Sequence, residues 1–179
     1  MKKLSPKEVR ICAQLLARAE FPLPQALFDA WVENLPHVAI ELAVLRECEQ
    51  EKKTPVVEIF LTRRPSTDPF WPNMWHMPGT ILRQNERVSR ALGRLINTEL
   101  GLLSTNFEPA CFRKVFEFVR GHRFNESARG HEIGLLHILK IPSNCACTGG
   151  KFFSLKHLPQ DIIPFHRLMT LELKRGKVE

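Results

Sequence analysis

The clearest chemical signal in the sequence is Glu99, a glutamate on the apolar side of an amphipathic helix. This helix is predicted to have Asn85 as its N-cap and to end at Gly101. The apolar residues of this helix recur at spacings of three and four and are Val88, Ala91, Leu92, Leu95 and Ile96. At about 100° per residue, Glu99 falls in the middle of their stripe. Burying an unpaired carboxylate costs several kcal/mol, so it needs a cation, hydrogen-bond donors or a route to water. Glu99 is therefore either part of a site or a side chain that bends out to solvent from the last helical turn.

The residues around Glu99 have a recognisable spacing. A turn at Trp75-His76-Met77-Pro78-Gly79-Thr80 precedes the helix. Together they resemble the Nudix box, whose pattern is G-x5-E-x7-R-E-U-x-E-E-x-G-U, with U an aliphatic residue. With Thr80 at the first glycine position, the residues in register are Glu86, Arg94, Ile96, Glu99, Gly101 and Leu102. The resemblance covers roughly residues 35–175, and it implies a Nudix-like α/β/α sandwich with a mixed β-sheet.

The box departs from the family pattern at the positions that bind metal. The family has metal-binding glutamates at three helix positions, which here are Leu95, Thr98 and Glu99. The resemblance therefore implies Mg²⁺ or Mn²⁺ as cofactor, with Glu99 as the remaining metal ligand. Because hard divalent cations prefer carboxylate oxygens, the loss of two glutamates predicts weaker binding or fewer ions. Thr80 also adds a side chain where the loop backbone has to approach a ligand.

The segment from Arg94 to Leu102 resembles more narrowly the modified box of the GDP-mannose mannosyl hydrolase branch, which also keeps one glutamate here. This resemblance implies a single metal ion and attack by water on the anomeric carbon of a sugar, releasing a nucleoside diphosphate. It also implies that Arg64 grips the diphosphate, since a guanidinium binds phosphate oxygens bidentately. The resemblance also implies that Gly79 belongs to the loop that approaches the substrate.

The general base is harder to assign. In that branch it is a histidine from the loop corresponding to residues 142–150, where this chain has none. The nearest substitutes are His131 and Glu132, since a histidine is a natural base and a glutamate a natural metal ligand. The alternative is that both are solvated residues at the end of a strand.

Three further residues are candidates for the site. In the family, the residue at Glu86 orients the catalytic helix or its metal, and the residue at Arg94 is its partner. Here they are equally explained by an ordinary exposed ion pair. Arg123, in the basic connection 121–130, could contact an anionic substrate, although such loops often simply vary.

Strands and helices in mixed order have to position these residues. Apolar and β-branched residues predict strands at 37–46, 55–64, 111–120, 131–141 and 151–154, followed by a last helix at roughly 160–174. This order is typical of an α/β sandwich.

The chain has a length of 179 residues, which suits a single core. Residues 35–179 are expected to form the Nudix domain and residues 1–34 an N-terminal helical extension. The extension is predicted to hold two short helices that are separated at Phe21-Pro22-Leu23-Pro24. It could cap the core, form a homodimer contact or close over a site.

The charge and composition of the chain limit the classes of molecule that it is expected to bind. A net charge of +7 favours anionic ligands, but Lys and Arg are scattered, so no specific nucleic-acid site is expected. No apolar run reaches the roughly 18 residues that span a bilayer, which argues against a membrane protein. The five cysteines are an odd number and lie in apolar segments, as expected for reduced thiols in the cytoplasm.

Two functions follow from these observations. The first is a Mg²⁺-dependent hydrolase of a small-molecule nucleotide, namely a nucleoside diphosphate linked to another moiety such as a sugar. The alternative is a catalytically impaired Nudix-fold module that binds a nucleotide. The degenerate box at Leu95 and Thr98 is the reason that both remain open.

Overall fold

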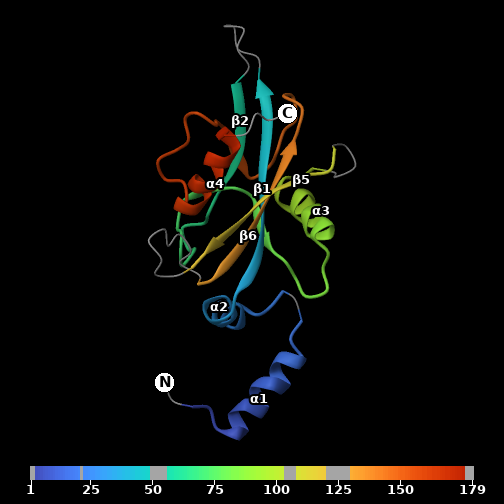
Figure 1. Cartoon of the computed structure of the whole chain (residues 1–179), viewed down its shortest axis with the longest axis vertical. Coiled ribbons are helices and arrows are strands. Elements are labelled where there is room, and N and C mark those ends of the chain that lie inside the picture. Colours follow the sequence, from blue (N-terminus) through green and yellow to red (C-terminus); the bar gives the residue numbers. More distant parts are fainter. Residues whose placement is uncertain (1–2, 21, 49–55, 103–107, 120–129, 176–179) are drawn as a thin grey trace.

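The computed structural model describes residues 3–20, 22–48, 56–102, 108–119 and 130–175. Its elements, in chain order, are α1 (Pro6–Ala17), α2 (Gln25–Asn34), β1 (His37–Cys48), β2 (Val56–Arg63), β3 (Trp75–His76), β4 (Gly79–Ile81), α3 (Val88–Glu99), β5 (Cys111–Phe118), β6 (Glu132–Lys140), β7 (Gly150–Ser154) and α4 (Pro164–Arg175). Figure 1 shows the mixed sheet at the centre of the molecule, with α3 and α4 beside it.

The strands form one seven-stranded mixed sheet whose main order is β3-β2-β1-β6-β5. β1 is its centre. It pairs with β6 in parallel over nine residues, from His37 to Leu45. On its other edge it pairs antiparallel with β4 at its beginning and with β2 at its end. β1 therefore connects the strand that carries Gly79 to the strand that leads to Arg64.

Side chains of β1 alternate between two apolar clusters, as the two-residue period of a strand requires. Ile40, Leu42 and Val44 pack with the apolar stripe of α3 on one face. Ala43 and Leu45 belong to the cluster on the other face, which contains α4 residues. The sheet therefore lies between α3 and α4, which confirms the predicted α/β/α sandwich.

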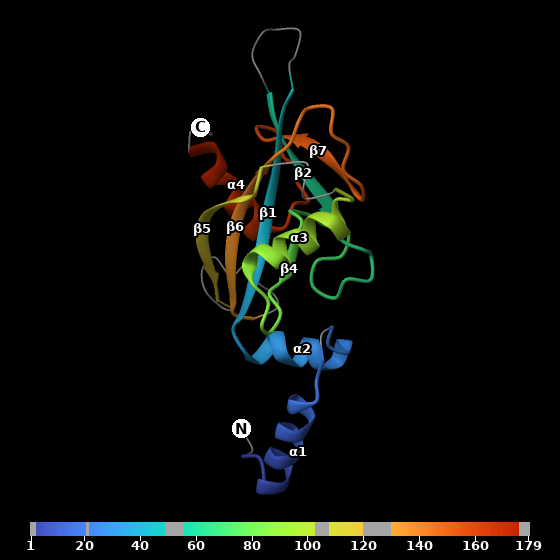
Figure 2. The ribbon, with the colours of Figure 1, turned by 90° about the vertical axis from the view of Figure 1, so that its right-hand side faces the viewer.

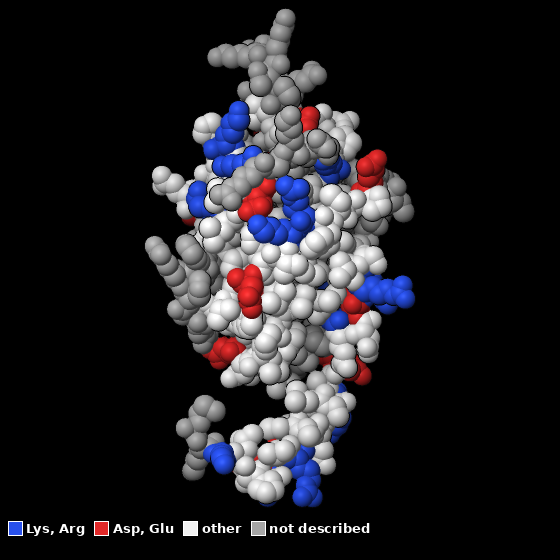
Figure 3. Space-filling model, in the orientation of Figure 1, with Lys and Arg blue, Asp and Glu red and all other residues white. Residues whose placement is uncertain are grey.

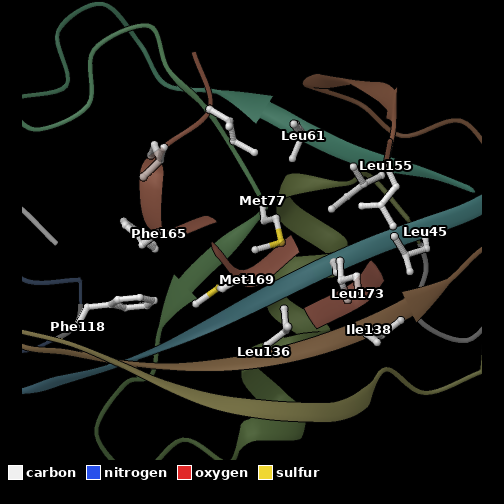
Figure 4. Packing of buried hydrophobic residues seen from close by; sticks show 14 residues of the cluster. Leu45, Leu61, Met77, Phe118, Leu136, Ile138, Leu155, Phe165, Met169 and Leu173 are labelled. Atoms are coloured by element: carbon white, nitrogen blue, oxygen red, sulfur yellow. The ribbon is translucent and has the colours of Figure 1, made fainter. Parts of the chain in front are cut away.

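The cluster on the α4 face is shown in Figure 4, where Met77 and Met169 lie between the sheet and the helix. Both methionines are fully buried. Met77 follows β3 directly, so the chain before Gly79 is anchored in the core. Residues 75–80 were predicted to form only a turn, but the structure has the short strands β3 and β4 on either side of Met77 and Pro78.

The two N-terminal helices differ in how they contact the domain. α1 begins with a capping box of Ser5 and Glu8 but has no buried residue, and it stands away from the sheet in Figures 1 and 2. α2 lies across the end of the sheet (Figure 2) and buries Val32 completely. The carbonyl oxygen of Val32 lies so close to Gly130 that a Cβ there would be 2.5 Å from it.

Two predicted helix starts were wrong. Asn85 is not the N-cap of α3, because it adopts a left-handed conformation (φ 59°) in the preceding turn, which asparagine tolerates better than most residues. Arg87 is the N-cap. The last helix begins at Pro164 rather than near Gln160, since Ile162 forms a bridge with Trp75 and proline is favoured in the first helical turn.

The surface agrees with the scattered charge of the sequence. On the face shown in Figure 3, Lys and Arg are spread over the domain and interspersed with Asp and Glu. Among the residues that the structure describes, no helix is long and apolar enough to cross a membrane.

Candidate active site

Helix α3 ends at Glu99, and the following residues fix this end. Gly101 has φ +65°, a left-handed conformation that favours glycine after a helix, and a Cβ there would lie 2.9 Å from the Thr148 hydroxyl. The Thr148 amide donates to the Leu100 carbonyl at 3.1 Å. The sequence signal at Gly101 therefore marked the helix end correctly.

Glu99 is partly buried, and its surroundings disfavour its charge. Burial and the nearby carboxylate of Glu41 raise the pKa of Glu99 to about 7, although Arg64, the Gly79 amide and Arg94 act in the opposite direction. The Gly79 amide donates a hydrogen bond to Glu99. The structure thus brings together three predicted site residues, Glu99, Arg64 and Gly79.

Glu41 is the residue that sequence reasoning missed. It lies in the middle of β1 and is only 5% exposed. A Cβ on Gly79 would lie 2.5 Å from the Glu41 Oε2 atom, so only glycine at position 79 leaves room for this carboxylate. A sequence signal was available, because Glu41 is a single carboxylate inside an otherwise apolar strand, where a charge needs a partner.

Two buried histidines, His76 and His166, form hydrogen bonds with the backbone of Met77, just before Gly79. The Met77 amide donates to His166 Nδ1 at 2.9 Å, so the proton of a neutral His166 is on Nε2, which faces Glu41 Oε2 at 3.3 Å. His76 has the opposite tautomer. Its Nδ1 donates to the Met77 carbonyl at 2.7 Å, and its Nε2 accepts from the Thr62 hydroxyl at 3.0 Å. The turn before Gly79 is therefore fixed by directed hydrogen bonds, and His166 also lies beside the Glu41 carboxylate.

These residues border a cavity of about 760 Å³. Its lining includes Glu41, Arg64, Gly79, Arg94 and His166, together with residues of α2. Glu99 adjoins the same wall through its interactions with Gly79, Arg64 and Glu41. The volume is within the range of roughly 300–1,000 Å³ that is usual for small-molecule sites. Arg64 is partly exposed and lies 3.6 Å from Asp68, so its guanidinium is at the cavity surface.

Glu86 and Arg94 form a clamp between α3 and the loop before it. Arg94 Nε and Nη2 donate to the two oxygens of Glu86 at 3.0 and 2.9 Å, and Nη1 donates to the Thr80 hydroxyl at 2.6 Å. The Arg83 amide donates to Glu86 at 3.1 Å. Arg94 and the other contacts lower the pKa of Glu86. The pair is partly buried rather than an ordinary exposed one, and its geometry positions the loop against the helix.

Comparison with known proteins identifies the architecture. No protein-family model and no curated protein matches the sequence. Among solved structures, a mutT/nudix family protein from Listeria innocua is similar, with 17% identity, TM-score 0.62, and coverage of 77% of this chain and 91% of the other. The chain has a Nudix fold.

Two further Nudix-fold structures have named ligands or activities. The NUDIX domain of Shewanella oneidensis NrtR, complexed with ADP ribose, is 12% identical with a TM-score of 0.59 and covers 90% of this chain and 96% of that one. The Ap4A hydrolase of C. elegans is 14% identical with a TM-score of 0.56, and the match covers 78% of this chain and 95% of that one.

Two other predicted site residues, His131 and Glu132, are not brought to the cavity. His131 Nε2 lies 3.0 Å from Glu117, and Glu132 is buried with its Oε2 atom 3.2 Å from His37 Nε2. Neither His131 nor Glu132 is among the described residues that line the cavity. Glu132 is thus a buried partner of His37 rather than a solvated residue. Arg123 lies outside the residues that the structure describes.

Leu95 and Thr98, which replace two glutamates of the box, have structural roles in this Nudix fold. Leu95 is fully buried in the cluster under α3, whereas Thr98 is exposed and its hydroxyl donates to the Arg94 carbonyl at 2.7 Å. The described residues contain no group of three or more His, Cys, Asp or Glu suited to a metal ion. Glu41 and Glu99 instead form a pair of carboxylates. Such a pair fits Mg²⁺, which is commonly bound through one or two carboxylates, waters and substrate phosphates.

Proposed function

We propose that this Nudix-fold protein is a divalent-metal-dependent hydrolase of a nucleoside diphosphate linked to another moiety, for example a sugar. The observation that carries the proposal is that Glu41 and Arg64 line a cavity of about 760 Å³ and that Glu99 interacts electrostatically with both. Two like charges in a partly buried place are unfavourable without a counter-charge, and the raised pKa of Glu99 expresses that cost. A cation between the carboxylates would remove it.

In this proposal each residue has a separate task. Glu41 and Glu99 bind Mg²⁺ or Mn²⁺, and His166, whose Nε2 lies 3.3 Å from Glu41 Oε2, supports the position of Glu41. Arg64 binds phosphate oxygens at the cavity surface. Gly79 brings its amide to Glu99 and leaves space for Glu41. When bound, the metal ion would neutralise the diphosphate and stabilise charge on the departing group.

The kind of substrate is supported from two directions. The arginines of the cavity suit an anionic ligand, and two neighbours by fold are an Ap4A hydrolase and a NUDIX domain complexed with ADP ribose. Both names denote an adenosine joined through phosphates to a second group. The finer expectation, cleavage at the sugar carbon of a nucleotide sugar, follows from the resemblance of residues 94–102 to the mannosyl hydrolase branch.

The test is turnover of a panel containing GDP-mannose, ADP-ribose and Ap4A with Mg²⁺ or Mn²⁺, with products identified by mass. We expect Glu99→Gln to lower kcat/KM by about 100-fold or more, because a metal centre contributes several kcal/mol to such reactions. Asn97→Ala, on the exposed side of the same helix, is the matched control and should leave the rate unchanged. Unaltered turnover in Glu99→Gln would show that the carboxylate pair is not the catalytic centre.

A second candidate is a Nudix-fold module that binds a nucleotide without hydrolysing it. The burial of Leu95 and the bond of Thr98 to the helix backbone favour it, because these positions are used for packing and local structure. A nucleotide that raises Tm, while the wild type turns over no compound of the panel, would establish this function. Steady turnover by the wild type that Glu99→Gln abolishes would exclude it.

A further inference from the structure

The cavity beside Glu99 has two chemically different sides. On one side, Arg64 follows β2 and suits phosphate, whereas Arg94 of α3 is already paired with Glu86. The other side is formed by the extension before β1, through Leu23, Phe28 and Asp29. The first side carries the Arg64 guanidinium together with the Glu41 carboxylate, whereas the second presents an aromatic ring and the Asp29 carboxylate.

Helix α2 is firmly placed against the domain and is therefore a structural wall of the cavity. Val32 is fully buried, and its carbonyl oxygen closely approaches Gly130. Trp31 contacts the His37 ring with centroids 6.2 Å apart, and Phe28 contacts Trp31 edge-on, also at 6.2 Å. Phe28 is thus held by a chain of aromatic contacts that leads into β1.

The negative charge of Asp29 on α2 disfavours a phosphate beside this helix. Asp29 would repel a diphosphate, which the arginine side attracts. Its Oδ1 atom accepts one hydrogen bond from Gln25 Nε2 at 2.7 Å, but a carboxylate can accept up to about four, so it retains acceptor capacity. Phe28 offers a ring to a nucleobase, which has a π-face. A ring and an acceptor, without a positive charge, suit the uncharged part of a nucleotide.

We propose that α2 forms the nucleoside-binding half of the site, with the base stacked against Phe28 and the ribose hydroxyls donating to Asp29. The inference rests on the proposed function, since it assumes that the phosphates lie at Arg64 and the carboxylate pair. It makes the N-terminal extension part of the substrate site.

The test uses the full chain and measures binding of ADP, GDP, UDP and inorganic pyrophosphate by calorimetry with Mg²⁺. Phe28→Ala should raise the Kd of a nucleoside diphosphate by roughly 5- to 150-fold, the range of one base-stacking contact, and leave that of pyrophosphate within about twofold. Phe28→Trp should restore nucleotide binding. Leu27→Ala is the matched control, because this exposed residue of the same helix does not line the cavity.

Asp29 is tested with a ligand that lacks ribose hydroxyls. The wild type should bind ADP more tightly than 2′,3′-dideoxy-ADP, and Asp29→Ala should bind the two equally. Circular dichroism and Tm of each variant show that α2 is still folded.

Three results would overturn the proposal: wild-type affinity for ADP in Phe28→Ala, equal losses of ADP and pyrophosphate, or no binding of any nucleoside diphosphate by the wild type. Its failure is distinguishable from that of the proposed hydrolase. If the wild type binds ADP through Phe28 but hydrolyses nothing, the hydrolase is wrong and the nucleoside site stands. If the wild type hydrolyses the panel and Phe28→Ala binds ADP normally, only the nucleoside site is wrong.

Discussion

Glu86 and Glu99 lie just before α3 and at its last residue, and the protein surrounds these two carboxylates in opposite ways. Glu86 receives both donors of the Arg94 fork and the Arg83 amide, which together lower its pKa. Glu99 is partly buried beside a second carboxylate, Glu41, and its pKa rises to about 7.

The difference separates a structural role from a binding role. The Glu86 region is electrostatically complete, so adding a cation there would gain nothing. The Glu99 region is held in an unfavourable state by the rest of the fold, and a bound divalent ion would relieve it. Each prediction below tests one half of this contrast.

The largest effect on stability is expected at the clamp. Arg94→Met should lower the free energy of unfolding by about 3–5 kcal/mol, because it leaves the Glu86 carboxylate, with 8% of its side chain exposed, without its partner. Urea denaturation at pH 7.5 measures it. Arg90→Met, an exposed position of the same helix, should change stability by less than about 0.5 kcal/mol. A loss below about 1 kcal/mol in Arg94→Met would mean that the clamp is not a stabilising feature.

The sequence predicted the parts of this contrast that depend on local pattern. The apolar stripe of α3 and the glycine after its end located Glu99 on a buried face, and the spacing of the box paired Glu86 with Arg94. Alternating and apolar runs located five of the seven described strands within a few residues, whereas the two short strands β3 and β4 lie in the segment predicted as a turn. These signals are local, because helix and strand periodicity are properties of neighbouring residues.

The rest of the site depends on contacts between distant segments. Glu41 and His166 are far apart in the chain. They meet only because the Glu41 side chain points to the face of the sheet that α4 covers. The position of Phe28 also depends on tertiary structure, because Phe28 lines the cavity only where α2 crosses the end of the sheet. The side-chain chemistry of His131 and Glu132 predicts a base and a metal ligand, whereas their contacts with Glu117 and His37 depend on how the strands pair.

The next effect concerns pH. Because the folded-state pKa of Glu99 is about 7 and the ordinary value is 4.5, the folded protein binds more protons in this window. Without metal, its contribution to stability is present below pH 4.5 and is lost as the pH rises to about 7, at a cost of the order of 2 kcal/mol. Glu99→Gln should remove this loss and be more stable than the wild type at pH 8. Glu86 does not change the pH dependence of stability between pH 4.5 and pH 7, since its pKa is lowered below this range.

Chemical denaturation from pH 5 to pH 8 in EDTA, compared between the wild type and Glu99→Gln, measures this difference. Parallel stability curves for the two proteins would contradict the raised pKa and the unfavourable pairing of Glu99 with Glu41.

The most direct test of the central claim, that Glu41 and Glu99 together hold a divalent cation, is calorimetric titration of the metal-free protein with Mn²⁺ at pH 8. The wild type should bind one ion. Glu99→Gln and Glu41→Gln should each lose most of that affinity, whereas Asn97→Ala should keep it. Binding should weaken at pH 5.5, where the proton competes with the ion for Glu99. Undiminished Mn²⁺ binding in both glutamine variants, or none in the wild type, would contradict the assignment of this carboxylate pair as the metal site.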